Sequence, residues 1–135
     1  LFHNCQISIH QSADTAYFHL INRHLFEMLL MNILTNAVKY TDAATPQVEI
    51  HIDTGRRWTH IRFTDNGIGF DRREMKKIFK KIYQIGRSDD MTAKGSGLGL
   101  HLVQTIARFH KGKVVAESAG RGHGSTFTLM LPALN

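Results

Sequence analysis

Hydrophobic and polar residues alternate in several short stretches, and this period of two predicts β-strands. The strands are expected at QISIH (6–10), TAYFHL (15–20), QVEIHI (47–52), WTHIRFTD (58–65), KVVAES (113–118) and STFTLML (125–131). In the third of these, the alternation places Val48, Ile50 and Ile52 on one face. Turns at 55–57 and at AGRGHG (119–124) predict that the flanking strands pair in antiparallel fashion.

Apolar residues recur at helical spacing in two longer stretches. Asn22 is suited to cap a helix that runs to about Tyr40, and a second helix is predicted from about Leu98 to His110. A short basic helix is expected over 71–82. Helices packed against one side of the strands give an α+β fold, a two-layer α/β sandwich with a mixed, mostly antiparallel sheet.

Composition restricts the class of protein. The chain has 135 residues, 42% hydrophobic and 21% charged, which is typical of one globular domain over residues 1–135. It has no apolar run of the roughly 20 residues that cross a bilayer and no visible signal peptide, so a cytoplasmic domain is expected. The single Cys5 forms no internal disulfide, which suits a reducing compartment.

Charge and histidine content address possible ligands. The net charge of +6 favours an anionic partner, such as nucleic acid, a phosphorylated ligand or an acidic protein. None of the nine histidines forms HExxH or another tight metal pair, and one cysteine disfavours a structural zinc site. His51 and His60 are expected on the polar faces of their strands.

A polar stripe interrupts the apolar pattern of the first helix. Asn32, Asn36 and Lys39 lie within about 40° of one another around the helix axis at 100° per residue. A solvated face explains such a stripe. Asparagine oxygens with a lysine also suit Mg²⁺ and its attached phosphates.

Two glycine-rich segments carry the other candidate chemistry. In KGSGLGL (94–100) the glycines expose backbone amides where a helix begins, which suits phosphate binding, although a flexible hinge also fits. In TDNGIGF (64–70) Asp65 ends a strand and can accept a hydrogen bond from an exocyclic amine such as adenine N6. Gly67 and Gly69 would let the backbone approach a flat ring, and a plain turn is the alternative.

Taken in order, these segments resemble the ATP-binding catalytic domain of sensor histidine kinases. The resemblance covers the chain from about Asn22 to Pro132. NILTNAVKYT is similar to the N box, TDNGIGF to the first glycine box, IFKKIYQ to the F box, GSGLGL to the second glycine box, and GHGSTFTLMLP to the last glycine box. The resemblance implies the Bergerat ATP-binding fold of the superfamily shared with gyrase, mismatch-repair ATPases and a heat-shock chaperone.

The resemblance also implies roles for individual residues. Asn36 would coordinate Mg²⁺, Asn32 would help to organise the metal and triphosphate, Lys39 would lie near phosphate, and Tyr40 would lie against the nucleotide. Asp65 would bind the adenine amine, Gly67, Ile68 and Gly69 would shape its pocket, Phe79 belongs to the F box, and Thr126 would support Asp65 through water. Residues 83–96 would form a lid, with phosphates held by Lys94, Gly95, Ser96, Gly97, Leu98, Gly99 and Leu100.

The resemblance implies kinase chemistry with ATP and Mg²⁺ as cofactors. ATP hydrolases of the superfamily carry glutamate at the position of Asn32, and asparagine cannot act as that base. No His-Glu/Asp-x-x-x-Pro acceptor motif occurs, so the phosphorylated histidine and its dimerising helices are expected N-terminal to Leu1 or on another protein. A response regulator and a homodimeric full-length protein are the implied partners, and any membrane segment would lie upstream.

Two features leave alternatives open. Ile82 and Gln84 stand where the family commonly has a second phenylalanine and an arginine, which favours a degenerate nucleotide sensor or docking module. Arg87 or Lys94 could replace the missing arginine. The basic run DRREMKKIFKKI fits a solvated helix face, a docking surface for an acidic response regulator or helical stalk, or, third, a nucleic-acid contact, for which base-reading elements are missing.

Overall fold

A computed structural model describes residues 4–11, 17–80 and 99–134. In this part of the chain a mixed sheet of five strands packs against two α-helices. In sequence order the elements are β1 (Gln6–Gln11), α1 (Arg23–Lys39), β2 (Gln47–Asp53), β3 (Trp58–Asp65), the 3₁₀ helix η1 (Arg72–Glu74), α3 (Gly99–Phe109), β4 (Lys113–Glu117) and β5 (Ser125–Pro132). The predicted α+β sandwich is confirmed.

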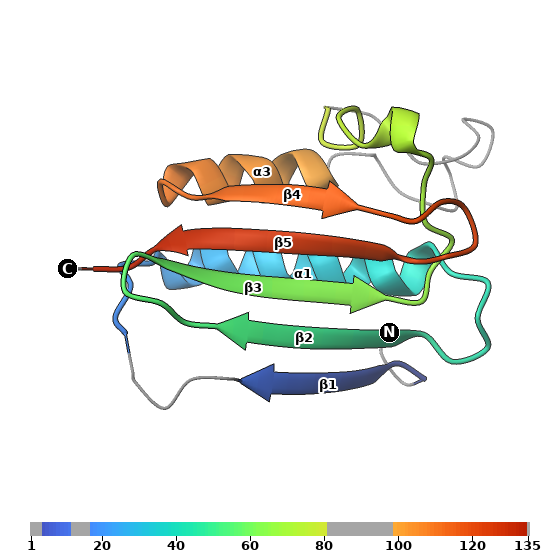
Figure 1. Cartoon of the computed structure of the whole chain (residues 1–135), viewed down its shortest axis with the longest axis horizontal. Coiled ribbons are helices and arrows are strands. Elements are labelled where there is room, and N and C mark those ends of the chain that lie inside the picture. Colours follow the sequence, from blue (N-terminus) through green and yellow to red (C-terminus); the bar gives the residue numbers. More distant parts are fainter. Residues whose placement is uncertain (1–3, 12–16, 81–98, 135) are drawn as a thin grey trace.

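The strands are ordered β1-β2-β3-β5-β4 across the sheet (Figure 1). β1 runs parallel to β2, whereas β2–β3, β3–β5 and β4–β5 are antiparallel pairs. β3 is the central strand, and its last residue, Asp65, lies opposite Val48 on one side and Ser125 on the other. The end of β3 is therefore enclosed by both neighbouring strands.

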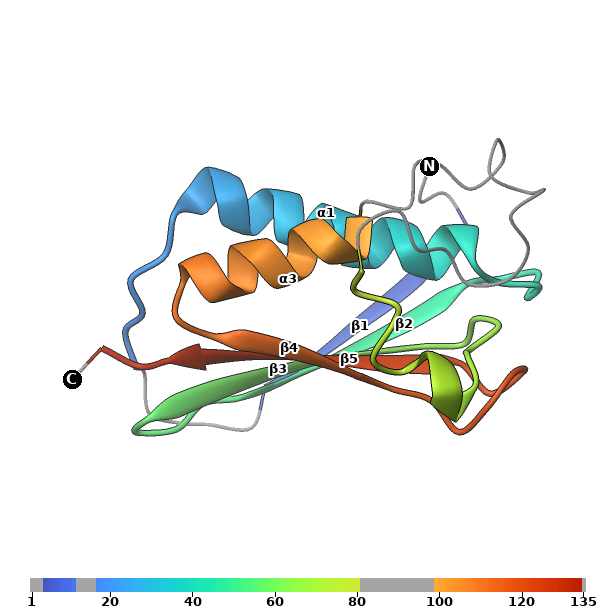
Figure 2. The same ribbon diagram turned by 90° about the horizontal axis from the view of Figure 1, so that it is seen from above.

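Both α-helices cover the same face of the sheet (Figure 2). The core lies between the two layers and buries side chains from each of them, namely Leu29 and Ile33 of α1, Val103 and Ile106 of α3, and Val48, Phe63 and Leu129 of the sheet. The period-two pattern of the strands thus directs alternate residues into the core. The opposite face of the sheet has no helix over it in the described ranges.

The ends of α1 follow from local hydrogen bonds. Asn22 caps the helix as predicted, because its side-chain oxygen accepts the N–H of Leu25 at 3.0 Å. The helix ends at Lys39, and the next residue, Tyr40, leaves the helical conformation with φ −105° and ψ 56°. This change of direction brings the chain after α1 toward the end of β3.

Two predicted elements differ from the structure. The described part of TAYFHL, residues 17–20, is not a strand, because Phe18 and Leu20 are 74% and 82% exposed and Phe18 O accepts one bond, from Leu134 N–H at 2.7 Å. The predicted basic helix over 71–82 is replaced by η1 and turns up to residue 80, while 81 and 82 lie outside the described residues. The backbone hydrogen bonds of residues 71–80 are mostly of the i→i−3 type, as from Met75 N–H to Arg72 O and from Lys80 N–H to Lys77 O, so the segment forms tight turns instead of a continuous α-helix.

In the described ranges, the helices fall short of the length and apolarity that a bilayer crossing requires.

His110 connects the two helices at the end of the molecule away from Asp65. Its Nδ1 lies 2.8 Å from the Ile106 carbonyl oxygen, and its Nε2 accepts the backbone N–H of Asn22 at 2.9 Å. The ring is therefore the neutral tautomer with the proton on Nδ1. We expect His110→Ala to lower the free energy of unfolding by about 1–3 kcal/mol in urea titrations, because it removes both bonds from a buried side chain.

The exposed His24 on α1 provides the matched control, and His24→Ala should change the unfolding free energy by less than about 0.5 kcal/mol. Equal effects of the two substitutions would show that the His110 bridge does not stabilise the fold.

Candidate functional site

The candidate site lies where α1 ends beside the loop that follows β3. The Tyr40 carbonyl oxygen accepts the N–H of Ile68 at 2.8 Å. Gly67 lies so close to the same carbonyl that a Cβ at this position would overlap it. Glycine at 67 is thus required by close packing of two backbones, and this contact holds the helix end against the loop.

Asp65 is held from one side by backbone N–H groups. Its Oδ1 accepts the N–H of Gly67 at 2.9 Å and of Ser125 at 3.2 Å. Burial raises the pKa of the Asp65 carboxyl, and these two hydrogen bonds partly oppose that increase. No described residue donates a hydrogen bond to Oδ2, so this oxygen can accept one from a ligand.

A small cavity adjoins the Asp65 carboxyl. Its volume is about 10 Å³, and it is lined by Asn36, Tyr40, Asp65, Ile68, Gly69, Ser125 and Phe127. This space suits about one water molecule. Tyr40 is half-buried there, and burial raises the pKa of its phenol. The structure therefore brings the end of α1, the 65–69 loop and the start of β5 together around the Asp65 carboxyl.

Gly69 makes a second close approach, which explains the second glycine of TDNGIGF. Its φ is +68°, a conformation that disfavours residues with a Cβ. A Cβ there would lie 2.5 Å from Gly120 O, 2.7 Å from Gly124 O and 2.7 Å from Ser118 Oγ. The loop after β3 is thus in contact with the glycine-rich turn between β4 and β5.

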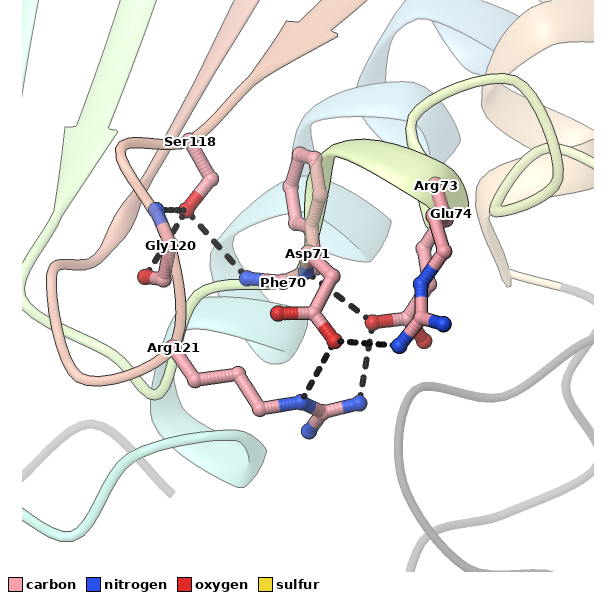
Figure 3. Close-up of polar contacts among 7 residues, drawn as sticks. All are labelled: Phe70, Asp71, Arg73, Glu74, Ser118, Gly120 and Arg121. Atoms are coloured by element: carbon pink, nitrogen blue, oxygen red, sulfur yellow. Dashed lines mark hydrogen bonds and ion pairs between the residues drawn. The ribbon is translucent and has the colours of Figure 1, made fainter.

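Ser118 and Arg121 fix that turn (Figure 3). The Ser118 hydroxyl accepts the N–H groups of Phe70 and Gly120, both at 3.2 Å, and donates to Gly124 O at 2.6 Å. Arg121 forms ion pairs with Asp71 Oδ2 at 3.4 Å and with Glu74 Oε1 at 2.9 Å. The sequence motifs did not reveal these roles. The Phe70 partner of Ser118 and the Asp71 partner of Arg121 each lie about 50 residues away in the chain.

Asn66 is another residue whose role the sequence did not reveal. Its side-chain oxygen accepts the N–H of Gln47 at 2.8 Å, and its amide donates to Thr45 O at 3.1 Å. These bonds join the loop to the start of β2. An Asn-Gly step was the available signal, since asparagine commonly binds nearby backbone in turns.

The polar stripe of α1 is divided between two environments. Asn36 lines the cavity, whereas Asn32 donates from Nδ2 to Met28 O at 2.7 Å within the helix. The first residue of α3, Gly99, lies against Asn32, because a Cβ on Gly99 would be 2.9 Å from Asn32 Oδ1. Lys39 is exposed and does not line the cavity.

The remaining predicted residues fall in different places. The Thr126 hydroxyl lies 3.3 Å from that of Thr64, whereas the backbone N–H of the neighbouring Ser125 donates directly to Asp65, so the support of Asp65 by Thr126 through water stays a prediction. Thr126 pairs with Thr64 in register, and both side chains point to the sheet face opposite that of Asp65. Phe79 and Leu100 are in the core, with Phe79 edge-on to Phe127. Lys94, Gly95, Ser96, Gly97 and Leu98 lie outside the described residues, as do Ile82, Gln84 and Arg87.

Comparison with protein families identifies one match, over residues 21–135, to "Histidine kinase-, DNA gyrase B-, and HSP90-like ATPase". The chain is 32% identical over 131 residues to the sensor-like histidine kinase SenX3 of Mycolicibacterium smegmatis, which covers 96% of this chain and 33% of that relative. It is 36% identical over 104 residues to the sensor histidine kinase RppB of Synechocystis, covering 77% of this chain and 22% of the relative. The chain thus spans about a third or less of these relatives' length.

Solved structures share the fold. The mycobacterial sensor histidine kinase MprB superposes with a TM-score of 0.82 at 20% identity, over 98% of this chain and 86% of that one. Full-length ShkA in complex with AMPPNP superposes with a TM-score of 0.78 at 23% identity, over 97% of this chain and 26% of that one. At these identities the likeness concerns the arrangement of helices and strands.

The contact at Gly69 leads to a prediction on stability. Gly122 also has a positive φ, 87°, but a Cβ there would meet nothing within 4 Å. Gly122→Ala should therefore cost only the left-handed backbone penalty of about 1–2 kcal/mol. Gly69→Ala should lower the free energy of unfolding by about 1–3 kcal/mol more, because of overlap with the β4–β5 turn. Urea unfolding of both variants measures this difference, and equal losses would exclude the steric contact.

Asp65 leads to a prediction on pH. The pKa of its carboxyl is raised from 3.8, so the folded chain binds this proton more tightly than the unfolded chain, and stability falls as pH rises through the raised pKa. The amide that Asp65→Asn introduces cannot ionise but keeps an oxygen for the two N–H donors. The unfolding free energy of Asp65→Asn minus that of the native chain should become more positive between about pH 4 and about pH 7. A constant or decreasing difference in urea titrations would contradict the burial of this carboxyl.

Proposed function

The chain belongs to the family of histidine kinase-, DNA gyrase B- and HSP90-like ATPases, and we propose that it is the ATP-binding catalytic domain of a sensor histidine kinase. In this proposal it binds MgATP and donates the γ-phosphate to a histidine outside this chain. The identity of at least 32% to proteins named as sensor histidine kinases supports this choice within the family. The geometry around Asp65 is the observation that carries the nucleotide assignment.

The adenine amine is the proposed partner of Asp65. Backbone N–H groups occupy Oδ1 of Asp65, a residue that lines the cavity, and Oδ2 would serve as a pure acceptor when the carboxyl is ionised. The exocyclic N6 of adenine is a donor, whereas guanine carries an oxygen at the equivalent position. The site therefore favours adenine over guanine. The AMPPNP complex of the similarly folded ShkA, an adenine nucleotide complex, supports the same choice.

The pocket has to widen before it can hold a base. A cavity of about 10 Å³ is far smaller than an adenine ring, and half-buried Tyr40 and Ile68 are among its lining side chains. The rigid part is the backbone: Asp65, Gly67 and Gly69 are held by hydrogen bonds and close contacts. We propose that side chains at the α1 end move while this backbone stays fixed.

Phosphate and Mg²⁺ are proposed to bind along the polar stripe of α1. The side-chain oxygen of Asn36 is a suitable hard ligand for Mg²⁺, which usually binds few protein groups besides phosphate and water. The ion would neutralise phosphate charge. Asn32 lies beside the first residue of α3, where helix N–H groups favour an anion, and the exposed Lys39 would reach a phosphate from the same helix.

Asn32 favours transfer over hydrolysis. An asparagine cannot remove a proton from water, and its amide already donates to Met28 O at 2.7 Å. Phosphoryl transfer depends mainly on positioning and on charge neutralisation, which the remaining groups can supply. This argues against the hydrolase and serine kinase members of the superfamily as models for this chain.

The acceptor and downstream partners are proposed from the relatives. The chain has no His-Glu/Asp-x-x-x-Pro motif, and it matches 33% of SenX3. We propose that the acceptor histidine lies on a helical dimerisation domain in another part of a homodimeric protein, and that a response-regulator aspartate then receives the phosphoryl group. A nucleotide sensor without transfer is the second candidate, favoured by Ile82 and Gln84.

Calorimetry tests nucleotide binding. We expect micromolar to sub-millimolar affinity for MgATP and at least about tenfold weaker binding of MgGTP. Asp65→Asn should weaken MgATP binding at least about tenfold, because the two N–H donors hold Oδ1 and would direct the new amide donor at the adenine amine. Asn36→Ala should weaken binding as well, through loss of the metal ligand.

Asp42→Asn removes the same charge from an exposed position outside the cavity and should leave affinity unchanged. Absence of MgATP binding to the native chain would exclude the kinase assignment. If binding is intact, phosphotransfer to a supplied acceptor domain separates the kinase from the nucleotide sensor.

A further inference from the structure

A pair of histidines lies on the open face of the sheet, opposite the face on which Asp65 and the candidate nucleotide site lie. His10 of β1 pairs directly with His51 of β2, and their rings are stacked with centroids 4.6 Å apart and planes inclined by 14°. Glu49 precedes His51 by two residues and so shares its face. The Glu49 carboxylate is 3.8 Å from His10 Nε2. We propose that His10, Glu49 and His51 bind a divalent transition-metal ion, with zinc as the reference ion.

The distances suit a three-ligand site. One ligand atom from each residue lies within 4.8 Å of the other two, so a common centre is no more than about 2.8 Å from each (4.8 Å divided by √3). Zinc requires about 2.0–2.2 Å to nitrogen and oxygen. To close the site, each ligand atom moves by less than about 1 Å, and the two stacked rings tilt so that the ion lies in the plane of each imidazole. The His10 and Glu49 side chains are 53% and 57% exposed, which leaves room for this movement. Water would complete a tetrahedron.

The type of ligand selects the ion. Two imidazoles and one carboxylate prefer zinc, copper or nickel over Mg²⁺, which favours oxygen ligands alone. The site is therefore chemically distinct from the Mg²⁺ position proposed at Asn36. Nearby charges are balanced: Arg62 is opposite His51 in the sheet, and its guanidinium is 3.8 Å from the Asp53 carboxylate. A bound cation would thus lie next to the negative charge of Glu49, while Asp53 offsets the positive charge of Arg62.

The ion would stabilise the edge of the sheet. All six residues of β1 are exposed, and among the described strands β1 pairs with β2 alone, in parallel. Ile9 is on the helix side of the sheet but is 66% exposed, so the described helices cover little of β1. An ion held by both strands would be bound in the paired register only, and its binding would stabilise that register. Metal binding would therefore strengthen the attachment of β1 to the sheet.

The experiment uses the untagged 135-residue chain without nucleotide. We expect ZnCl₂ to bind with a micromolar Kd in calorimetry and to raise the Tm, with EDTA reversing the shift and MgCl₂ giving none. Hydrogen exchange should slow at the β1 amides. His10→Ala and His51→Ala should each weaken zinc binding at least about tenfold, because each leaves two ligands.

His60→Ala is the matched control. His60 is exposed on the same sheet face in β3 and is not one of the three ligands, so zinc binding should be unchanged. Three results would overturn the proposal: no zinc binding at about 100 μM, well above the expected micromolar Kd, binding that survives in either His10→Ala or His51→Ala, or an equal loss in His60→Ala.

Discussion

The Asp65 carboxylate is the group on which the arrangement of the candidate site depends. One oxygen accepts N–H groups from the loop after β3 and from the start of β5, two segments 60 residues apart. These bonds use Oδ1, and no described residue donates to the second oxygen, which keeps its acceptor capacity. The fold thereby holds a partly buried carboxylate, whose pKa burial raises, as a fixed acceptor beside a cavity with a mixed polar and apolar lining.

The backbone around this carboxylate is rigid for steric reasons. Gly67 is in contact with the end of α1, and Gly69 with the turn between β4 and β5, so the two glycines bring three elements to one point. Ser118 and Arg121 then hold that turn to residues 70–74 through hydrogen bonds and ion pairs. A loop fixed in this way can present Asp65 with little reorganisation when a ligand binds. Because the cavity is too small for a base, the movement that binding requires has to come from the side chains around it.

The two faces of the sheet carry different chemistry. The covered face combines the core with the candidate nucleotide site, where α1 supplies amide side chains and the N-terminus of α3 lies beside Asn32. The open face is polar and holds the proposed metal ligands at the β1–β2 edge. Nucleotide would bind at the end of the helix layer, whereas metal would bind at the outermost strand, β1, and its neighbour β2. The two sites share β2 but none of their residues.

Much of the local structure was predictable because it depends on neighbours in sequence. The alternation in QVEIHI and WTHIRFTD predicted β2 and β3, and Asn22 was identified as the cap of α1. The basic run was predicted as a helix because its apolar residues recur at helical spacing, a pattern that does not show whether the backbone continues as an α-helix or as the tight turns that the structure has. Residues 17–20 alternate like a strand, but the described sheet offers them no partner strand, only a single bond to Leu134 N–H.

The candidate site was predicted in part for the same reason. The sequence by itself determined the strand and helix pattern, the glycines at 67 and 69, and the acid at 65, because these are choices of residue type at positions close in the chain. Only the tertiary structure decided that the backbone N–H of Ser125 donates to Asp65, that Ser118 and Arg121 hold the β4–β5 turn, and that His10 stacks on His51. Strand register and side-chain direction decide such contacts, and they arise from packing between residues about 40 to 60 positions apart.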